Sequence, residues 1–150
     1  MYVTYIATTP EKVWHALVDS EMTRNYWARH DNVSDWKPGS RWTHQDADNP
    51  SLVDVVGTVI ESSPPRRLVL SWANPADEKD RAKHSRVTFD LEPMMDAVRL
   101  TVTHDELEDD SPMLHGISKG WPFVLSSLKT LLETGRALTM TTKRMTAPPA

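Results

Sequence analysis

Six tryptophans stand in this chain of 150 residues, and their indole rings are the side chains best suited to bind an apolar molecule. Each ring offers a broad apolar face and one N–H group that donates a hydrogen bond. Four of them fall on expected strands, turns or the last helix, near one face of a sheet: Trp36, Trp42, Trp72 and Trp121. We expect an aromatic lining for an apolar ligand there, with core packing as the alternative. Trp14 and Trp27, beside the first helices, are expected to pack in the core.

His104 is the histidine that the sequence pattern places beside this lining. Strand alternation puts it on the same face as Leu100 and Val102. An imidazole there would hydrogen-bond a ligand carbonyl or hydroxyl, or carry a proton. The alternative is a half-buried histidine that is satisfied by backbone groups. One histidine and a cavity do not specify a reaction, so we assign no catalytic residue.

The remaining histidines lack the spacing of a metal site. Each falls in a different expected element: His15, His30, His44, His84 and His115. His44 shares a face with Trp42 and would approach His104 only if the strand order allows it; otherwise these are scattered surface histidines. Five carboxylates within residues 105–110 lack the glycine and oxygen spacing of a calcium loop, which favours a solvated loop. We assign no metal and no cofactor, since phosphate-loop and dinucleotide motifs are also missing.

Charge and cysteine content narrow the class of protein. The chain carries 17 basic and 21 acidic residues, and a net charge of -4 disfavours nucleic acid as a partner. There is no cysteine, which fits a cytoplasmic location. No apolar run is long enough for a membrane span, and the first residues alternate instead of forming a signal peptide.

The expected elements would position these side chains on a curved sheet. The first strand covers residues 2–7, and Thr9, Pro10 and Glu11 predict the start of a short helix that reaches about Val18, before another short turn at 23–26. Five further strands are expected: 41–44, 52–61, 68–72, 86–91 and 97–104. Residues 92–96 are short enough for a hairpin connection. Gly57 predicts a bulge, so its strand is left out of the lining.

A long helix is expected near the end of the chain. Its apolar residues recur at steps of three and four: Trp121, Val124, Leu125, Leu128, Leu131 and Leu132. Pro122 is expected in its first turn and Gly135 at its C-cap, a length of about 14 residues. The predicted fold is α+β, a curved antiparallel sheet wrapped around this helix, with two short helices after the first strand. The domain covers residues 1–138, and 139–150 is a flexible tail.

The order of these elements and their sequence motifs resembles a known family. The motifs are TPEKVWHAL at 9–17, YW at 26–27, DWKPGS at 35–40, GTVIE at 57–61, PPRRL at 64–68, SRVTF at 85–89, LTVTH at 100–104, and GWP at 120–122 continuing to LETG at 132–135. Together they resemble the START-like helix-grip (SRPBCC) superfamily, and within it the homologues of the activator of heat-shock-protein ATPase. The resemblance implies a helix-grip fold with a cavity that in relatives accepts lipids, polyketides or other apolar molecules. It implies no invariant catalytic set, because relatives include carriers, cyclases and co-chaperone domains.

We therefore predict non-catalytic binding of a small lipophilic molecule, a lipid, polyketide or flavonoid-like aromatic, as a carrier or sensor. The expected lining comes from strands and the last helix: Trp42, Leu70, Trp72, Phe89, Leu100, Val102, His104, Trp121 and Leu125. Two alternatives remain open. One is a polyketide cyclase-like or hydrolase-like enzyme that uses His104, and the other is a co-chaperone-type module that binds a chaperone.

Overall fold

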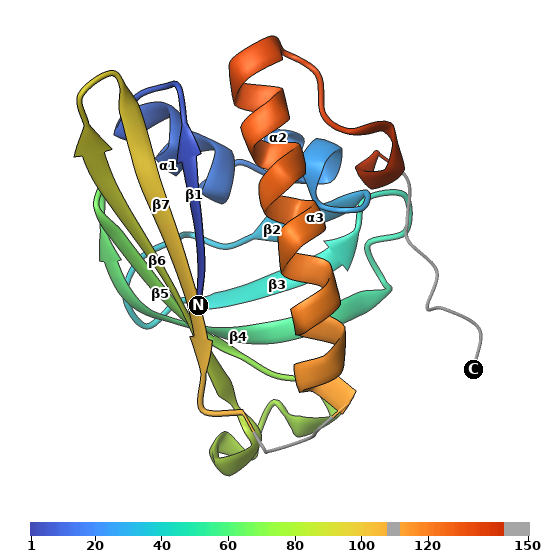
Figure 1. Cartoon of the computed structure of the whole chain (residues 1–150). Helices are drawn as coiled ribbons and strands as arrows, with labels where there is room; N and C mark the ends of the chain where they lie inside the picture. The colour runs from blue at the N-terminus through green and yellow to red at the C-terminus, as the bar shows by residue number, and fades with distance from the viewer. Residues whose placement is uncertain (108–111, 143–150) are drawn as a thin grey trace.

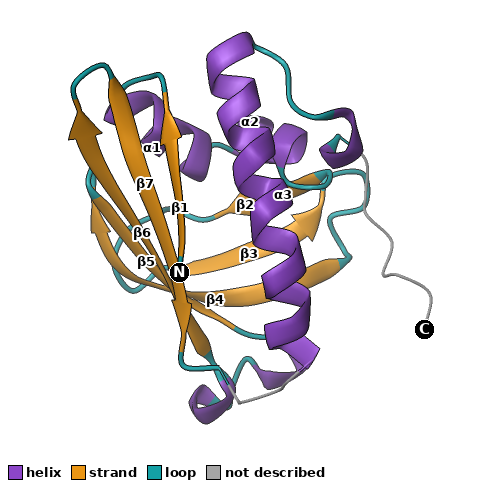
Figure 2. Ribbon diagram, in the orientation of Figure 1, coloured by secondary structure: helices purple, strands orange, loops and turns teal. Residues whose placement is uncertain are grey.

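A seven-stranded antiparallel sheet curls around one long helix, which crosses its concave side (Figure 1). The computed structural model describes residues 1–107 and 112–142. The strands lie in the order β1-β7-β6-β5-β4-β3-β2, and the two short helices stand beside the long one (Figure 2). The elements are β1 (Tyr2–Ile6), α1 (Pro10–Val18), α2 (Ser20–Tyr26), β2 (His30–Val33), β3 (Arg41–Asp46), β4 (Val53–Ser63), β5 (Arg67–Trp72), η1 (Pro75–Asp77), η2 (Arg81–Lys83), β6 (Ser85–Met94), β7 (Ala97–Asp105), α3 (Pro112–Thr134) and η3 (Thr139–Thr141). This confirms the predicted α+β helix-grip fold. None of the described helices is long and apolar enough to cross a membrane.

Helix α1 begins where the sequence predicts. The hydroxyl of Thr9 accepts the backbone N–H of Lys12 at 3.4 Å, and Pro10 occupies the first helical position, where its missing N–H costs nothing. Asp19 ends α1 and caps α2, because its carboxylate accepts the N–H of Glu21 at 2.8 Å. One residue therefore both separates the two short helices and starts the second.

Strand β2 was not among the predicted strands. Its sequence, HDNV, has no alternation of polar and apolar residues. Thr23 of α2 holds it instead, since its hydroxyl donates to His30 O at 3.1 Å and accepts the N–H of Asn32 at 3.0 Å. Arg24 adds two hydrogen bonds to the carboxylate of Asp31, at 2.9 and 3.0 Å. Contacts with a neighbouring helix, not local propensity, make this segment a strand.

The β6–β7 hairpin places its apolar residues on the predicted face. Phe89 pairs with Val102, and Val87 pairs with His104. The strands run further than expected, so that only two residues, Met95 and Asp96, connect them. Met95 takes a φ of 56°, the left-handed backbone conformation that such a tight turn requires.

Gly57 does not mark a bulge, contrary to the prediction. It pairs directly with Trp42 of β3, and the register shift of β4 against β5 lies between Val59 and Glu61. The indole N–H of Trp42 passes over Gly57 to donate to Ser71 O at 2.8 Å. A Cβ at position 57 would lie 1.9 Å from that oxygen and 2.5 Å from the indole nitrogen. Glycine is present here because two neighbouring groups approach its backbone closely.

Helix α3 is longer than predicted. It spans Pro112–Thr134, so Pro122 lies inside it and not in its first turn. Pro122 and Ser118, the residue one turn before it, are both exposed, so the carbonyl that loses its N–H partner faces water, which can replace the missing hydrogen bond. Gly135 ends the helix as expected, with a φ of 84° and its N–H donated to Leu131 O at 2.8 Å.

The described start of the predicted tail contains a short turn. Residues 139–141 form the turn η3, in which the buried Thr141 shares a hydrogen bond with Ser127 of α3 and donates to Asn25 O at 3.2 Å. Residues 143–150 of the predicted tail and 108–110 of the acidic stretch lie outside the described residues.

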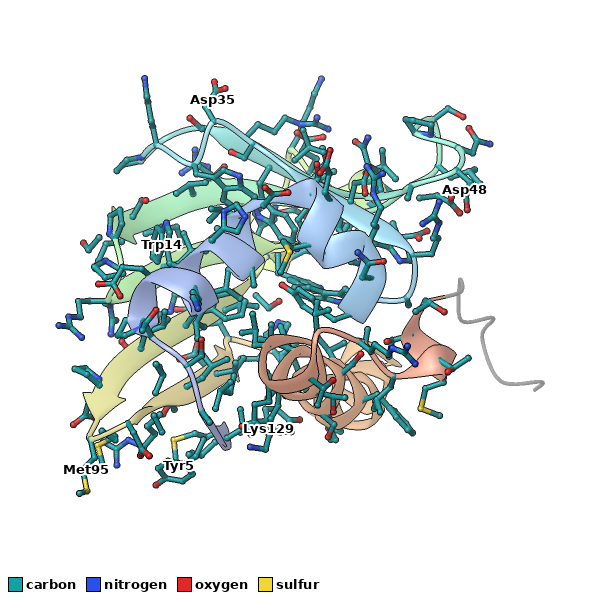
Figure 3. The ribbon with its side chains drawn as sticks, turned by 90° about the horizontal axis from the view of Figure 1, so that it is seen from above. Tyr5, Trp14, Asp35, Asp48, Met95 and Lys129 are labelled. Atoms are coloured by element: carbon teal, nitrogen blue, oxygen red, sulfur yellow. The ribbon has the colours of Figure 1, made fainter. Side chains whose placement is uncertain are left out.

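The outer edge of β1 is covered by α3. Lys129 donates to Tyr5 O at 2.7 Å, and Glu133 accepts the N–H of Ala7 at 2.8 Å, while the two side chains pair at 2.6 Å. The labelled Tyr5 and Lys129 lie side by side in Figure 3. These bonds occupy backbone groups that an exposed edge strand would otherwise offer to another chain.

Candidate ligand site between the sheet and helix α3

The nine predicted lining residues come together on the concave side of the sheet. Eight of them are buried in a single hydrophobic cluster: Trp42, Leu70, Trp72, Phe89, Leu100, Val102, Trp121 and Leu125. His104 is half-buried and contacts the rings of Trp72 and Trp121. Their convergence is a structural finding, whereas their contact with a ligand stays a prediction.

Trp72 of β5 lies at the centre of an aromatic cluster. Five rings have centroids between 5.2 and 6.3 Å from its own: Trp27, Trp42, His44, His104 and Trp121. The rings of Trp72 and Trp27 are stacked, with an interplanar angle of 24°. Phe89 adds an edge contact to Trp121 at 5.8 Å. Broad aromatic faces from β3, β5, β6 and α3 therefore meet in one place.

Trp27 is a member of this cluster that the sequence analysis assigned only to core packing. It is buried, and its ring lies 5.2 Å from Trp121 and 5.1 Å from His44. It follows the last residue of α2, and the next two residues, Ala28 and Arg29, take φ values of 52° and 60°. That turn is not periodic, so no pattern in the sequence points Trp27 inward.

His104 is held from both sides by hydrogen bonds. The indole N–H of Trp121 donates to its Nδ1 at 3.2 Å, and its Nε2 lies 2.8 Å from the hydroxyl of Ser85. Because an indole nitrogen only donates, Nδ1 must accept, and the proton of the neutral ring sits on Nε2. The hydroxyl of Ser85 in turn donates a hydrogen bond to Trp72 O, at 3.2 Å. The chain of hydrogen bonds runs in one direction from α3 through β7 and β6 to β5.

The burial of His104 favours its neutral form. Desolvation lowers its pKa from 6.5 to about 4, against a smaller opposing effect of the Asp105 charge. At neutral pH both ring nitrogens are engaged, one as acceptor and one as donor. A proton-transfer role would require His104 to release Trp121 or Ser85 first.

His30 and His44 form a stacked pair at the other end of the cluster, with centroids 4.1 Å apart and planes 6° apart. Nδ1 of His30 lies 2.9 Å from Ala28 O and Nε2 lies 2.6 Å from Asp54 Oδ2, so both nitrogens face acceptors. His44 Nδ1 lies 2.6 Å from Asn32 Oδ1. The prediction of scattered surface histidines is therefore wrong for this pair, because strand β2 brings His30 beside β3.

The other histidines whose side chains the structure describes do not join the site. His15 is exposed and lies 3.3 Å from Asp19. Nε2 of His84 donates to two backbone carbonyls of the η1 loop, at 3.1 and 3.0 Å. The side chain of His115 lies outside the described part of the chain. His15 and His84 therefore keep the surface role that their positions predict.

The site offers neither a metal cluster nor an unpaired polar group. Over residues 1–107 and 112–142, no three His, Asp or Glu side chains gather closely enough to hold a metal ion. Each buried side-chain nitrogen and oxygen in the same ranges has a hydrogen-bond partner. A polar ligand would therefore exchange hydrogen bonds with the site instead of satisfying an unpaired group.

Comparison with known proteins identifies relatives of this fold. The solved structure of CalU16 from Micromonospora echinospora has a TM-score of 0.68 at 21% identity, covering 87% of this chain and 63% of that one. The Aha1 dimer from Colwellia psychrerythraea has a TM-score of 0.73 at 20% identity, covering 91% of this chain and 96% of that one. An HSP90 activator from Plasmodium falciparum has a TM-score of 0.64 at 20% identity, covering 80% and 84%. At these identities the likeness concerns the fold.

No curated protein matches the chain significantly. Residues 7–133 match the family described as Activator of Hsp90 ATPase homolog 1-like protein. That range runs from the end of β1 almost to the end of α3, and so includes the whole aromatic cluster. The chain therefore belongs to the Activator of Hsp90 ATPase homolog 1-like family, within the START-like (SRPBCC) helix-grip superfamily.

Proposed function

We propose that this protein binds a small lipophilic molecule between the sheet and α3, as a carrier or sensor and without catalysis. The observation that carries the proposal is the meeting of Trp27, Trp72 and Trp121, whose ring centroids lie 5.2 to 6.3 Å apart. At these distances the rings contact one another, so a ligand would have to enter between them, which favours a flat aromatic ligand of the polyketide or flavonoid kind over a flexible lipid chain.

Trp121 is the ring that would move to admit the ligand. It belongs to α3, whereas Trp72 belongs to β5 and Trp27 follows α2, so a small displacement of α3 separates one wall from the other two. The side chain of Trp121 makes one hydrogen bond among the described residues, to His104. A ligand that enters between this indole and the other two rings is covered by aromatic faces on both sides.

The polar groups beside the rings would orient the ligand. His104 and Ser85 lie on one side, and His44 with Asn32 lies on the other. Each pair can exchange a hydrogen bond with a ligand hydroxyl or carbonyl without leaving a buried group unpaired. A ligand with oxygen at two edges of an aromatic body suits this arrangement.

The test is an amide NMR titration with flavonoids, polyketide-like aromatics, fatty acids and sterols, together with denaturing mass spectrometry of co-purified molecules. We expect saturable shifts on α3 and on the inward faces of β5, β6 and β7. Trp121→Ala should weaken binding about tenfold or more, because one aromatic wall is lost. Trp14→Phe is the matched control, since Trp14 of α1 makes none of the ring contacts in the described cluster. A folded sample with no saturable shift for any compound would refute the proposal.

A chaperone-binding role is the second candidate. It is favoured by the family description and by the likeness to an HSP90 activator from Plasmodium falciparum. The test is whether the purified chain binds an Hsp90 protein and raises its ATPase rate. Loss of this effect in surface variants, with retention in Trp121→Ala, would separate it from ligand binding.

The enzyme alternative requires a free His104. Both of its ring nitrogens are hydrogen-bonded, one to Trp121 and one to Ser85. This arrangement holds the imidazole in place and disfavours acid-base chemistry by His104. Turnover of a bound polyketide-like compound that is abolished by His104→Gln, with binding retained, would favour the enzyme. We propose that the protein binds its ligand in the cytoplasm, on the basis of the cysteine-free chain, and that its partner is not a nucleic acid, which the net charge of -4 disfavours.

A further inference from the structure

We propose a second binding site, for a small molecule that carries an oxyanion, in a cleft on the outer face of the sheet. The cleft has a volume of about 270 Å³ and is bordered by β4, β5, β6 and the loop that carries η1 and η2. This loop lies at the foot of the sheet in Figure 1, drawn in yellow-green. Ser71 and Arg86 line the cleft and alternate with the inward-facing Trp72 and Val87, so the cleft opens away from the aromatic cluster.

Arg81 is the group that would bind the anion. Among the residues that the structure describes, its side chain has no ion pair and no hydrogen bond, although it lines the cleft. The other arginines nearby are committed: Arg41 binds Glu78 with two bonds at 2.6 and 3.0 Å, and Arg86 binds Asp105 at 3.1 and 3.2 Å. A free guanidinium offers paired N–H donors that match a carboxylate or phosphate.

The two carboxylates in the cleft do not cancel this attraction. Glu78 is paired with Arg41, whose hydrogen bond holds the pKa of the Glu78 carboxyl below its usual value. Glu106 lies 3.9 Å from Arg86. Each lining carboxylate therefore faces an arginine, and Arg81 is the cleft arginine that no carboxylate of the described residues contacts.

The loop that presents Arg81 is internally hydrogen-bonded. Nε2 of His84 donates to Asp77 O and Glu78 O, and the carboxylate of Asp80 accepts the N–H of Ala82 at 3.2 Å. Arg81 thus stands on a preorganised turn, which lowers the entropy cost of binding an anion.

The floor of the cleft is made of small residues. Ser71 Oγ accepts the N–H of Thr58 at 2.8 Å, so its own proton is directed elsewhere and can be donated to a ligand. Gly57 also lines the cleft. Arg81 and Ser71 line the same cleft, and together they would donate to the oxygens of one anion.

The experiment is an NMR titration with inorganic phosphate and, separately, with acetate, at constant ionic strength set by sodium chloride. We expect saturable amide shifts at residues 57–58, 71 and 78–86. Arg81→Ala should weaken the affinity about tenfold or more, and Arg81→Lys should restore part of it. Arg66→Ala removes the same charge from another exposed arginine and should leave binding unchanged. The anion with the higher affinity, phosphate or acetate, assigns the class of oxyanion.

Three outcomes would overturn the proposal. They are non-saturating shifts with both anions, equal losses in Arg81→Ala and Arg66→Ala, or shifts confined to residues outside the cleft. If Arg81→Ala perturbs the fold, the affinities of Arg81→Lys and wild type are compared instead, and equal affinities would overturn the proposal. Anion binding is tested separately from binding in the aromatic cluster. The amide shifts of the cleft residues report the anion, and the indole N–H signals of Trp72 and Trp121 report any change in the interior.

Discussion

The indole N–H of Trp121 on α3 donates to Nδ1 of His104 on β7, at 3.2 Å. This bond fixes the tautomer of His104 and directs its other nitrogen to Ser85, 2.8 Å away. The long helix is therefore fastened to the sheet by polar contact in the middle of an apolar interface. The proposed movement of Trp121 would break this bond, and the neutral form of His104 is the form that accepts it.

Removing only the donor of this bond should weaken the fold measurably. Trp121→Phe keeps an aromatic ring against Trp27 and Trp72 but leaves Nδ1 of His104 unpaired, so we expect a loss of about 1–3 kcal/mol in the free energy of unfolding. Trp121→Ala also loses the packed ring and should cost about 3–5 kcal/mol. Urea denaturation measures both. An unchanged free energy of unfolding in Trp121→Phe would show that the hydrogen bond contributes nothing.

Acidification should destabilise the protein through His104. Its pKa is about 4 in the folded protein and 6.5 when unperturbed, so the unfolded chain binds its proton first as the pH falls. Stability is therefore complete above about pH 6.5 and is lost progressively toward pH 4, by about 3 kcal/mol in total.

The measurement is urea denaturation of wild type and His104→Gln between pH 4 and 7.5. The variant lacks the titrating group, so its stability should depend less on pH over this range. Parallel pH profiles for the two proteins would contradict the assignment to His104.

Substitution of Gly57 should disrupt the sheet. In Gly57→Ala the new methyl group would lie 1.9 Å from Ser71 O, a backbone atom of β5 that accepts the indole N–H of Trp42. We expect a loss of about 3 kcal/mol or more. Gly120→Ala is the control, because nothing lies within 4 Å of its Cβ position in α3, and there alanine should stabilise by about 0.5–1 kcal/mol. Thermal unfolding monitored by circular dichroism compares the two, and a tolerated Gly57→Ala would exclude the close approach.

Loss of Glu133 should loosen the edge of β1 without unfolding the protein. Its carboxylate accepts the N–H of Ala7 and pairs with Lys129, but it is exposed, so Glu133→Ala should change the free energy of unfolding only slightly. Hydrogen exchange of the Ala7 amide should become at least several-fold faster. Glu21→Ala, another exposed acidic residue on a helix, should leave this amide unchanged. An unaltered Ala7 rate would mean that β1 is protected by other contacts.

Local patterns in the sequence were sufficient for much of the fold. The cap at Thr9 and Pro10, the hairpin with Phe89 and Val102 on one face, and the apolar stripe of α3 are all readable, because each depends on neighbours within a few residues. The length of α3 was not readable, since Pro122 ends a helix only where its lost hydrogen bond cannot be replaced by water.

The composition of the candidate site was decided by tertiary structure. The strand alternation of the sequence determined which face carries Trp72, Leu100, Val102 and His104. It carried no information on strand β2, the stacking of His30 on His44, or the position of Trp27 against Trp121. These contacts join residues far apart in the chain, and they form because the order of strands in the sheet and the crossing of α3 bring them together. Alternation fixes the direction of a side chain within its own strand, whereas its partners depend on how separate elements pack.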